Sequence, residues 1–199
     1  MSTATLHPID AGSITSIPGF DAAGVAAGIK ANGALDVALV TSNRPCVAAA
    51  VFTTNAFKAA PVLYDQRILA ENPSGIRAVV INAGCANACT GEQGMRNAEA
   101  TAEAAAEALG IAPGDVMLMS TGVIGAQLPM DKLTRGVAAA AAQRSSSIDA
   151  GHDAARAIMT TDTRPKECAI RVTCEGASFT IGGMAKGAGM IHPNMATLL

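Results

Sequence analysis

The segment Ile76–Asn82 (IRAVVIN) constrains the fold more than any other part of the sequence. Its apolar residues form a nearly continuous run, which is typical of a strand buried on both faces. A second run of this kind, Asp115–Ser120 (DVMLMS), follows later in the chain. A strand buried on both faces needs a packed layer on each side. We therefore expect a sheet with helices layered against it.

Local patterns predict further strands and three helices. Four segments predict two hairpins, Asp36–Thr41 with Cys46–Phe52 around the turn-like SNRP, and Cys168–Cys174 with Gly176–Gly183. Alanine-rich and amphipathic stretches predict helices, and glycine or proline ends the first of them; the helical segments are Asn97–Leu109, Asp131–Arg144 and Asp153–Met159. The order of elements predicts an α/β (α+β) fold of mixed, mainly antiparallel sheets layered with helices, and the short stretch Ser145–Ser147 is the best candidate linker.

Composition excludes several classes of protein. Half of the 199 residues are hydrophobic and only 15% are charged, which is not the composition of a disordered chain. The net charge of −2 and the 3% aromatic content argue against nucleic-acid binding. We find neither a secretory signal nor a run of the roughly 20 apolar residues that a membrane helix needs. These features predict a cytoplasmic protein with no nucleic-acid or membrane partner.

The five cysteines are an odd number in a chain without a signal segment, and this predicts free thiols. Cys85 and Cys89 stand four residues apart, but no second cysteine or histidine pair completes a four-ligand site. We therefore expect no bound metal.

Two glycine-rich segments follow predicted strands. In Ser120–Gly125, successive backbone N–H groups can converge on an anion or an oxyanion, with the Thr121 hydroxyl as an added donor; a plain strand-to-helix turn is the alternative. In Gly182–Met190, Lys186 adds a positive charge, but the patterns of phosphate and dinucleotide loops are missing. This segment favours a carboxylate site over a nucleotide site, unless Lys186 is a solvated surface lysine. The threonines of Thr160–Thr163 either cap a turn or line a pocket beside Lys186.

Six ordered segments between Gly19 and Leu199 together resemble the ornithine acetyltransferases of arginine biosynthesis, also called glutamate N-acetyltransferases. The segments are GFDAAGVAAGIKANGALDVALV, AAVFTTNAFKAAPV, RAVVINAGCANACTG, STGVIGAQLPMDKL, AIMTTDTRPKE and GGMAKGAGMIHPNMATLL. Members of this family are made as a precursor about twice as long, which cuts itself at the Ala-Thr bond of a PxMAT motif. The resemblance places that cut between Ala196 and Thr197. It implies that residues 1–196 are the α chain, a single domain, and that residues 197–199 are the truncated start of a β chain.

The resemblance also implies the chemistry. Thr197 becomes the N-terminal nucleophile, because its freed α-amine can accept the hydroxyl proton. It takes the acetyl group from N2-acetyl-L-ornithine, and L-glutamate then accepts that group. Thr121 and Gly122 match the oxyanion hole, and Thr160, Lys186 and Thr197 match substrate-binding positions. No cofactor is implied, and the resemblance leaves open whether acetyl-CoA is a second donor.

The implied partner is the β chain of the same precursor, in an α2β2 heterotetramer acting on small amino-acid substrates. Because the rest of the site lies in that β chain, we expect this chain to be inactive alone. Two alternatives stay open. One is a small-molecule-binding or assembly domain of the same fold without activity. The other is a thiol enzyme using Cys85 or Cys89, although no histidine is placed by local pattern to act as its base.

Overall fold

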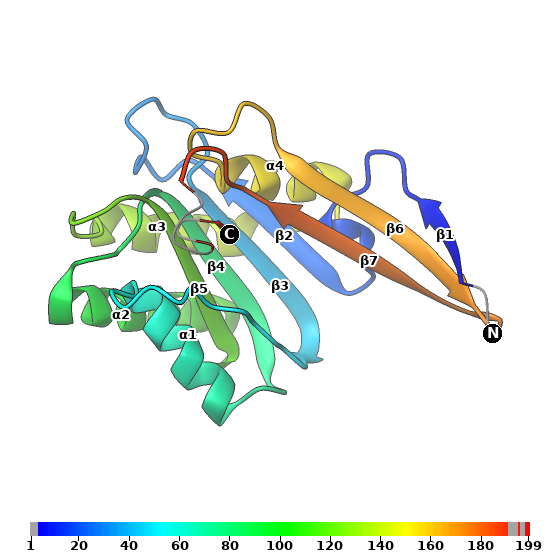
Figure 1. Cartoon of the computed structure of the whole chain (residues 1–199), viewed down its shortest axis with the longest axis horizontal. Helices are drawn as coiled ribbons and strands as arrows, with labels where there is room; N and C mark the ends of the chain where they lie inside the picture. Colours follow the sequence, from blue (N-terminus) through cyan, green and yellow to red (C-terminus); the bar gives the residue numbers. More distant parts are fainter. Residues whose placement is uncertain (1–3, 191–194, 196–197) are drawn as a thin grey trace.

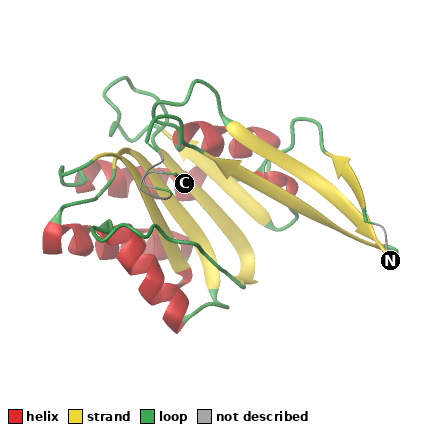
Figure 2. Ribbon diagram, in the orientation of Figure 1, coloured by secondary structure: helices red, strands yellow, loops and turns green. Residues whose placement is uncertain are grey.

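Two β-sheets form the framework of the molecule (Figure 1, Figure 2). The computed structural model describes residues 4–190, 195, 198 and 199. The four-stranded sheet has the order β2-β3-β4-β5, antiparallel except for the parallel β4–β5 pair, and the three-stranded sheet has the antiparallel order β1-β6-β7. The strands are β1 (Thr5–Pro8), β2 (Phe20–Val25), β3 (Val37–Cys46), β4 (Ile76–Cys85), β5 (Val116–Val123), β6 (Lys166–Cys174) and β7 (Ala177–Ala185).

Helices cover both faces of the four-stranded sheet. Helices α1, α2 and α3 form a layer on one face, and α4 packs on β2 and β3 from the other. Short 3-10 turns, η1 (Ile14–Ser16) and η2 (Pro113–Asp115), precede β2 and β5. The helices are α1 (Ala60–Glu71), α2 (Gly91–Leu109), α3 (Met130–Gln143) and α4 (Ile148–Ala157).

The three-stranded sheet extends away from α1, α2 and α3, and the turn between β6 and β7 lies at its far end (Figure 1). We call this sheet the arm. Within the part of the chain that the structure describes, no helix combines the length and the apolar character needed to cross a bilayer.

Small residues let the layers approach closely, which explains the low aromatic content. A Cβ atom at Gly24 of β2 would lie 2.1 Å from the Asp153 carbonyl oxygen of α4. A Cβ atom at Gly136 of α3 would lie 2.6 Å from the Ala27 Cβ atom. The core between α2, α3 and the sheet is largely alanine, valine and leucine. Contacts this short require glycine, because real Cβ atoms do not approach so near.

Most of the predicted elements are confirmed. The run Ile76–Asn82 forms β4, which lies between β3 and β5 and under helices. The β6–β7 hairpin, the three predicted helices and the layered, mainly antiparallel architecture are also present. The predicted linker Ser145–Ser147 is ordered structure, since Ser145 bridges to Ala22 and the Ser147 side chain caps α4. The domain assignment stays a prediction.

One predicted hairpin is wrong. Strand β3 continues through the SNRP segment to Cys46, and the segment Cys46–Phe52 is not its partner strand. Both edges of β3 are already paired, with β2 on one side and β4 on the other. Val47 and Val51, which the prediction placed in a strand, lie outside any strand and are 83% and 79% exposed. Strands β1 and β2 and helix α1 were not predicted.

Asp65 is a buried carboxyl group between α1 and β5, and it should make stability depend on pH. Its Oδ1 atom accepts the Leu118 N–H at 2.8 Å. Burial raises the pKa of Asp65 to about 7, and the Leu118 hydrogen bond opposes this only partly. Between pH 3.8 and about pH 7, Asp65 has lost its proton in the unfolded state but keeps it in the folded state. The folded state therefore loses stability as the pH rises through this window.

We expect Asp65→Asn to remove this pH dependence, because the amide keeps the acceptor oxygen and does not ionise. Urea unfolding should show the variant gaining more than about 1 kcal/mol on the parent between about pH 5 and about pH 8. Asp131→Asn, at an exposed position of α3, controls for the loss of one negative charge. If the unfolding free energies of the parent and Asp65→Asn changed in parallel with pH, the raised pKa of Asp65 would be refuted.

Candidate active site

Two glycines bring the ends of β4 and β5 into unusually close contact. Gly84 and Gly122 are register partners in the parallel pair, with φ angles of 112° and 134°. A Cβ atom at Gly122 would lie 2.3 Å from the Gly84 carbonyl carbon. Thr121 and Gly122 belong to β5 itself, and Ile124 and Gly125 of the first glycine-rich segment lie beyond that strand. The backbone at Gly122 is held in place by a contact that no side chain could replace.

Lys186 reaches Thr121 from the end of the arm. The Lys186 Nζ atom donates to the Thr121 Oγ1 atom at 3.0 Å, across 65 positions of sequence. Thr121 is fully buried and Lys186 is 2% exposed, so the solvated-lysine alternative is wrong. Gly182 and Gly183 lie in β7, as the predicted strand Gly176–Gly183 implied, and Lys186 directly follows that strand. The structure thus joins the two glycine-rich segments into one site.

Burial and the neighbouring charges shift the pKa of Lys186 in opposite directions. Burial lowers the pKa of Lys186, the Asp162 carboxylate raises it in part, and the nearby Lys166 cation lowers it further.

The Lys186 backbone N–H donates to the Leu199 carbonyl at 2.9 Å. A Cβ atom at Gly187 would lie 2.9 Å from the Leu198 side chain. Leu199 therefore lies against Lys186, and Leu198 lies against Gly187.

Asp162 is a functional candidate that the sequence analysis missed. Its side chain is fully buried and accepts hydrogen bonds from the Gly187 N–H at 2.9 Å and the Thr160 N–H at 3.2 Å. It also forms an ion pair with Lys166. Burial on its own raises the pKa of Asp162, but these donors outweigh burial and hold it well below its usual range. Asp162 thereby ties the loop that carries Thr160 to the end of β7. Aspartate is a common turn residue, and this was the only local signal for Asp162; the contact with Thr160 lies on the other side of Asp162 from the usual aspartate turn.

A second buried carboxylate organises the loop of residues 26–35 between β2 and β3. The Asp36 oxygens accept the N–H groups of Ala27 at 2.7 Å, Ile29 at 2.6 Å and Lys30 at 2.9 Å. A Cβ atom at Gly84 would lie 3.0 Å from the Ile29 side chain. The loop that Asp36 holds therefore packs against the Gly84–Gly122 contact. Sequence analysis had treated Asp36 only as the start of a strand.

Lys30 connects this loop to helix α4. Its Nζ atom donates to the Leu35 carbonyl and, at 3.1 Å, to the carbonyl of Ala157, the last residue of α4. A cation is favoured at a helix C-terminus by the helix dipole. Burial lowers the pKa of Lys30, Asp36 raises it, and Lys186 lowers it further. Lys30 and Lys186 are thus close enough to interact electrostatically.

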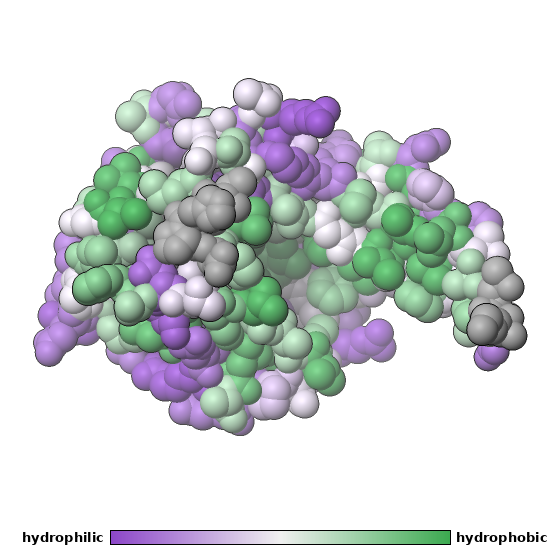
Figure 3. Space-filling view, viewed as in Figure 1, coloured by the Kyte–Doolittle hydropathy of each residue, from purple (hydrophilic) through white to green (hydrophobic). Residues whose placement is uncertain are grey.

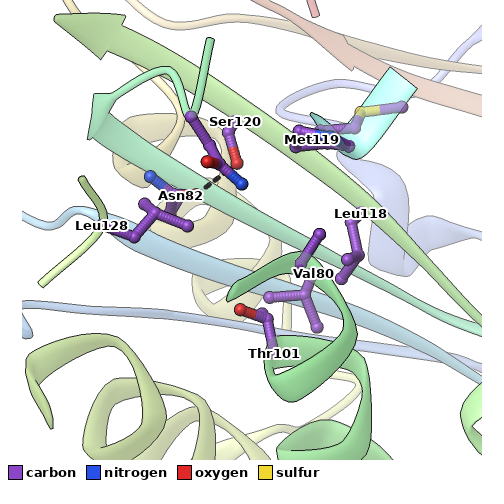
Figure 4. A pocket seen from close by; sticks show the side chains of 10 residues that line it. Val80, Asn82, Thr101, Leu118, Met119, Ser120 and Leu128 are labelled. Carbon is purple, nitrogen blue, oxygen red and sulfur yellow. Dashed lines mark hydrogen bonds between the residues drawn. The ribbon is translucent and has the colours of Figure 1, made fainter. Parts of the chain in front are cut away.

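A small cavity with apolar and polar lining lies beside β4 and β5 (Figure 4). Asn82 and Ser120 line it, and the Ser120 hydroxyl contacts the Asn82 Oδ1 atom at 2.6 Å. The Asn82 amide donates to the Cys85 carbonyl at 2.8 Å. The cavity holds about 10 Å³, which is room for about one water molecule. It is too small for an amino acid.

The predicted site residues fall into two groups. Thr121, Gly122 and Lys186 come together directly, and Thr160 joins them through Asp162 and Gly187. Ala196 and Thr197 lie outside the described residues, so the predicted cleavage site and nucleophile stay predictions.

The two cysteines of the thiol alternative differ in their surroundings. Cys85 is buried and its Sγ atom contacts the Ala126 carbonyl at 3.3 Å, whereas Cys89 is exposed. Of the described histidines, His152 pairs with Glu167 at 2.8 Å between α4 and β6, and His7 lies in β1. Neither histidine is bonded to these thiols. In the described ranges, no three His, Cys, Asp or Glu residues gather as a metal site would require.

Comparison with known proteins now defines the class. The ArgJ family model matches residues 21–199, and the chain belongs to this family, as the sequence resemblance predicted. The chain is 57% identical over 192 residues to the arginine biosynthesis bifunctional protein ArgJ of Symbiobacterium thermophilum, covering 95% of this chain and 46% of that protein. It is 51% identical to the protein of the same name from Dehalococcoides mccartyi, covering 94% of this chain and 45% of that one.

Two solved structures share the fold. One is the arginine biosynthesis bifunctional protein of Bacillus halodurans, with a TM-score of 0.91 and 39% identity, covering 98% of this chain and 100% of that chain. The other is ornithine acetyltransferase of Mycobacterium tuberculosis in complex with ornithine, with a TM-score of 0.89 and 48% identity, covering 99% and 100%. The chain thus spans about half the length of the curated relatives but the whole length of both solved chains.

The Gly84–Gly122 contact gives a stability prediction. We expect Gly122→Ala to cost at least about 2 kcal/mol of unfolding free energy, because the new Cβ atom must displace the Gly84 backbone. The control is Gly125→Ala, since Gly125 also has a positive φ angle, of 86°, but open space around its Cα atom. That variant should lose only about 1 kcal/mol. Equal losses in urea unfolding would contradict the close contact.

Proposed function

We propose that this chain is one half of an acyltransferase that moves an acetyl group from N2-acetyl-L-ornithine to L-glutamate, giving L-ornithine and N-acetyl-L-glutamate. The observation that carries the proposal is the buried contact between the Lys186 Nζ and Thr121 Oγ1 atoms beside Gly122, in a member of the ArgJ family. A buried cation beside hydroxyl and backbone donors suits a substrate with a carboxylate and an acyl carbonyl. The ornithine in the related M. tuberculosis structure carries such a carboxylate.

Thr121 and Gly122 are proposed to stabilise the oxyanion of the tetrahedral intermediate. The Thr121 oxygen accepts a hydrogen bond from Lys186, which holds the hydroxyl group beside Gly122. The Gly122 backbone is fixed by its contact with Gly84, so the adjacent groups need little reorganisation during the reaction. Lys186 is proposed to bind the α-carboxylate, with Thr160 held nearby by Asp162.

Thr197 is proposed as the nucleophile, after self-cleavage of the Ala196–Thr197 bond. Its hydroxyl oxygen attacks the acetyl carbonyl, the C–N bond of the acetylated amine breaks, and the amine of ornithine takes the proton. The glutamate amine then attacks the acetyl-threonine ester and regenerates the hydroxyl. The freed α-amine of Thr197 accepts and returns the proton, which an amide nitrogen cannot do before cleavage. Acetyl-CoA would enter as a second donor by forming the same ester.

The lengths of the relatives support a two-chain enzyme. The curated relatives are about twice as long as this chain, whereas both solved chains match it from end to end. Leu198 and Leu199, the two residues after position 197, lie against Gly187 and Lys186. The remaining half would supply the rest of the site and assemble with this chain, in the α2β2 form.

Activity can be measured in a full-length chain made by joining this chain to the unmatched half of the S. thermophilum relative. Ornithine release from N2-acetyl-L-ornithine and glutamate should fall about 100-fold or more in kcat for Thr121→Val, because one oxyanion donor is lost. Lys186→Met should lower kcat/KM by a similar factor of about 100. Arg96→Met, an exposed residue of α2, is the matched loss of a positive charge and should have no effect. Activity of Lys186→Met within about twofold of the parent would refute the role of Lys186.

The nucleophile assignment has its own test in the same joined chain. Thr197→Ala should abolish both cleavage and the acetyl-enzyme seen by intact mass, whereas Cys85→Ala with Cys89→Ala should keep both. If instead the double cysteine variant lost the acetyl-enzyme and Thr197→Ala kept it, the protein would be a thiol enzyme.

The 199-residue chain alone should show no turnover, because the proposed second half is absent. Steady acetyl transfer by this chain on its own would overturn the half-enzyme proposal.

A further inference from the structure

The end of β5 carries polar side chains on both of its faces. Because side chains alternate along a strand, Ser120 lies on the same face as Leu118, toward helices α1, α2 and α3. Thr121 lies on the other face, where Lys186 contacts it. Met119 packs against an apolar cluster on that second face, and Figure 3 shows hydrophobic residues between the arm and the helices. The polar groups at this end of β5 thus lie in apolar surroundings, where an unpaired polar group is costly.

Ser120 and Asn82 form a buried polar pair on the helix side of the sheet. They are register partners in the parallel β4–β5 pair, and the Ser120 hydroxyl donates to the Asn82 Oδ1 atom at 2.6 Å (Figure 4). Asn82 is only 3% exposed. Its Nδ2 group donates in turn to the Cys85 carbonyl at 2.8 Å. The Asn82 amide therefore connects a side chain of β5 to the backbone at the end of β4.

The peptide between Gly84 and Cys85 is the group against which Gly122 packs. A Cβ atom at Gly122 would lie 2.3 Å from the Gly84 carbonyl carbon and 2.6 Å from the Cys85 nitrogen. The pairing of β4 with β5 becomes irregular at this point, because Cys85 is paired with two different residues of β5. Irregular pairing disrupts the backbone ladder. The hydrogen bond from Asn82 to Cys85 supplies an attachment where the ladder is disrupted.

We propose that Asn82, held by Ser120, is a positioning residue for the oxyanion hole. It fixes the peptide between Gly84 and Cys85, and this peptide fixes the Gly122 backbone. The inference rests on the proposed function, which assigns stabilisation of the oxyanion to that backbone. A donor must lie about 2.7–3.1 Å from the oxyanion, so even a small displacement of Gly122 weakens its hydrogen bond.

This role predicts an effect on the chemical step and not on substrate binding. The oxyanion is absent from the bound substrate, so a displaced donor lowers kcat and kcat/KM by the same factor and leaves KM unchanged. Lys186, the proposed carboxylate contact, reaches β5 on the face opposite to Asn82. A residue that only stabilised the fold would leave both constants of the folded enzyme unchanged.

Kinetics of the joined full-length chain test the role of Asn82. Asn82→Leu is close to the parent in size and removes both hydrogen bonds, whereas Ser120→Ala removes one of them. Per mole of folded enzyme, kcat should fall about tenfold or more for Asn82→Leu and about threefold or more for Ser120→Ala, with KM within about twofold of the parent. Ser120→Thr keeps the hydroxyl donor and should recover most of the kcat that Ser120→Ala loses.

Asn72→Leu is the matched control. The Asn72 Nδ2 group also donates to a backbone carbonyl, that of Gly114, at 3.2 Å. Gly114 precedes β5, so this bond lies at the opposite end of the strand from Gly122. The control should keep the kcat and KM of the parent. Parental kcat in Asn82→Leu, a rise in KM alone, or an equal loss of kcat in Asn72→Leu would each overturn the inference.

Hydrogen exchange tests the same support without any need for activity. The Ala86 N–H, one residue beyond the supported peptide, donates to the Val123 carbonyl of β5 at 2.9 Å. In the joined chain, Asn82→Leu should speed exchange of the Ala86 amide about tenfold or more, as measured by mass spectrometry. The Leu118 amide, which donates to Asp65, should stay within about twofold. Unchanged exchange at Ala86 would overturn the inference, even if the variant loses activity.

The inference and the proposed function fail in different ways. A joined parent chain without acetyl transfer would refute the proposed function, while faster Ala86 exchange would still show that Asn82 supports the strand end. An active parent whose Asn82→Leu variant retains kcat would refute the positioning role alone. If Asn82→Leu does not fold, the comparison of Ser120→Ala with Ser120→Thr decides both readouts.

Discussion

The buried hydrogen bond from Lys186 to Thr121 is the interaction on which the arrangement of the site depends. It joins the end of the arm to the end of β5, and so connects the two sheets at one point. Burying an ammonium group is unfavourable unless it is paired or hydrogen-bonded. Thr121 supplies a hydrogen bond, and the Asp162 carboxylate supplies opposite charge close by. The ammonium group is thereby kept at a fixed position rather than in solvent.

Two buried carboxylates hold the loops around this contact. Asp36 accepts three backbone N–H groups and shapes the loop that packs on Gly84. Asp162 accepts two and joins Thr160 to Gly187. The carboxylate oxygens provide the hydrogen bonds that the buried N–H groups would otherwise make to water. The loops therefore stay fixed without regular secondary structure. Together with the Gly84–Gly122 contact, they preorganise the donors that the proposed reaction requires.

The sequence predicts what depends on local pattern. The β6–β7 hairpin and the buried run of β4 follow from alternation and hydrophobicity within each segment. The hairpin predicted around SNRP fails because the pairing of β3 with β2 and β4, which lie elsewhere in the chain, overrides a local turn signal. The meeting of Lys186 with Thr121 depends on how two sheets pack, so no spacing in the sequence encodes it. Only the family resemblance grouped these two residues in advance, and it assigned no role to Asp36, Asp162 or Asn82.

A double-mutant cycle on the unfolding free energy tests the central contact most directly. Thr121→Val and Lys186→Met are measured singly and together in the 199-residue chain by urea unfolding, so neither the second half nor any substrate is needed. A hydrogen bond to a charged group predicts a coupling free energy of at least about 1 kcal/mol between the two side chains. A coupling below about 0.3 kcal/mol, with the two single losses simply adding, would show that Lys186 and Thr121 do not interact as the structure places them.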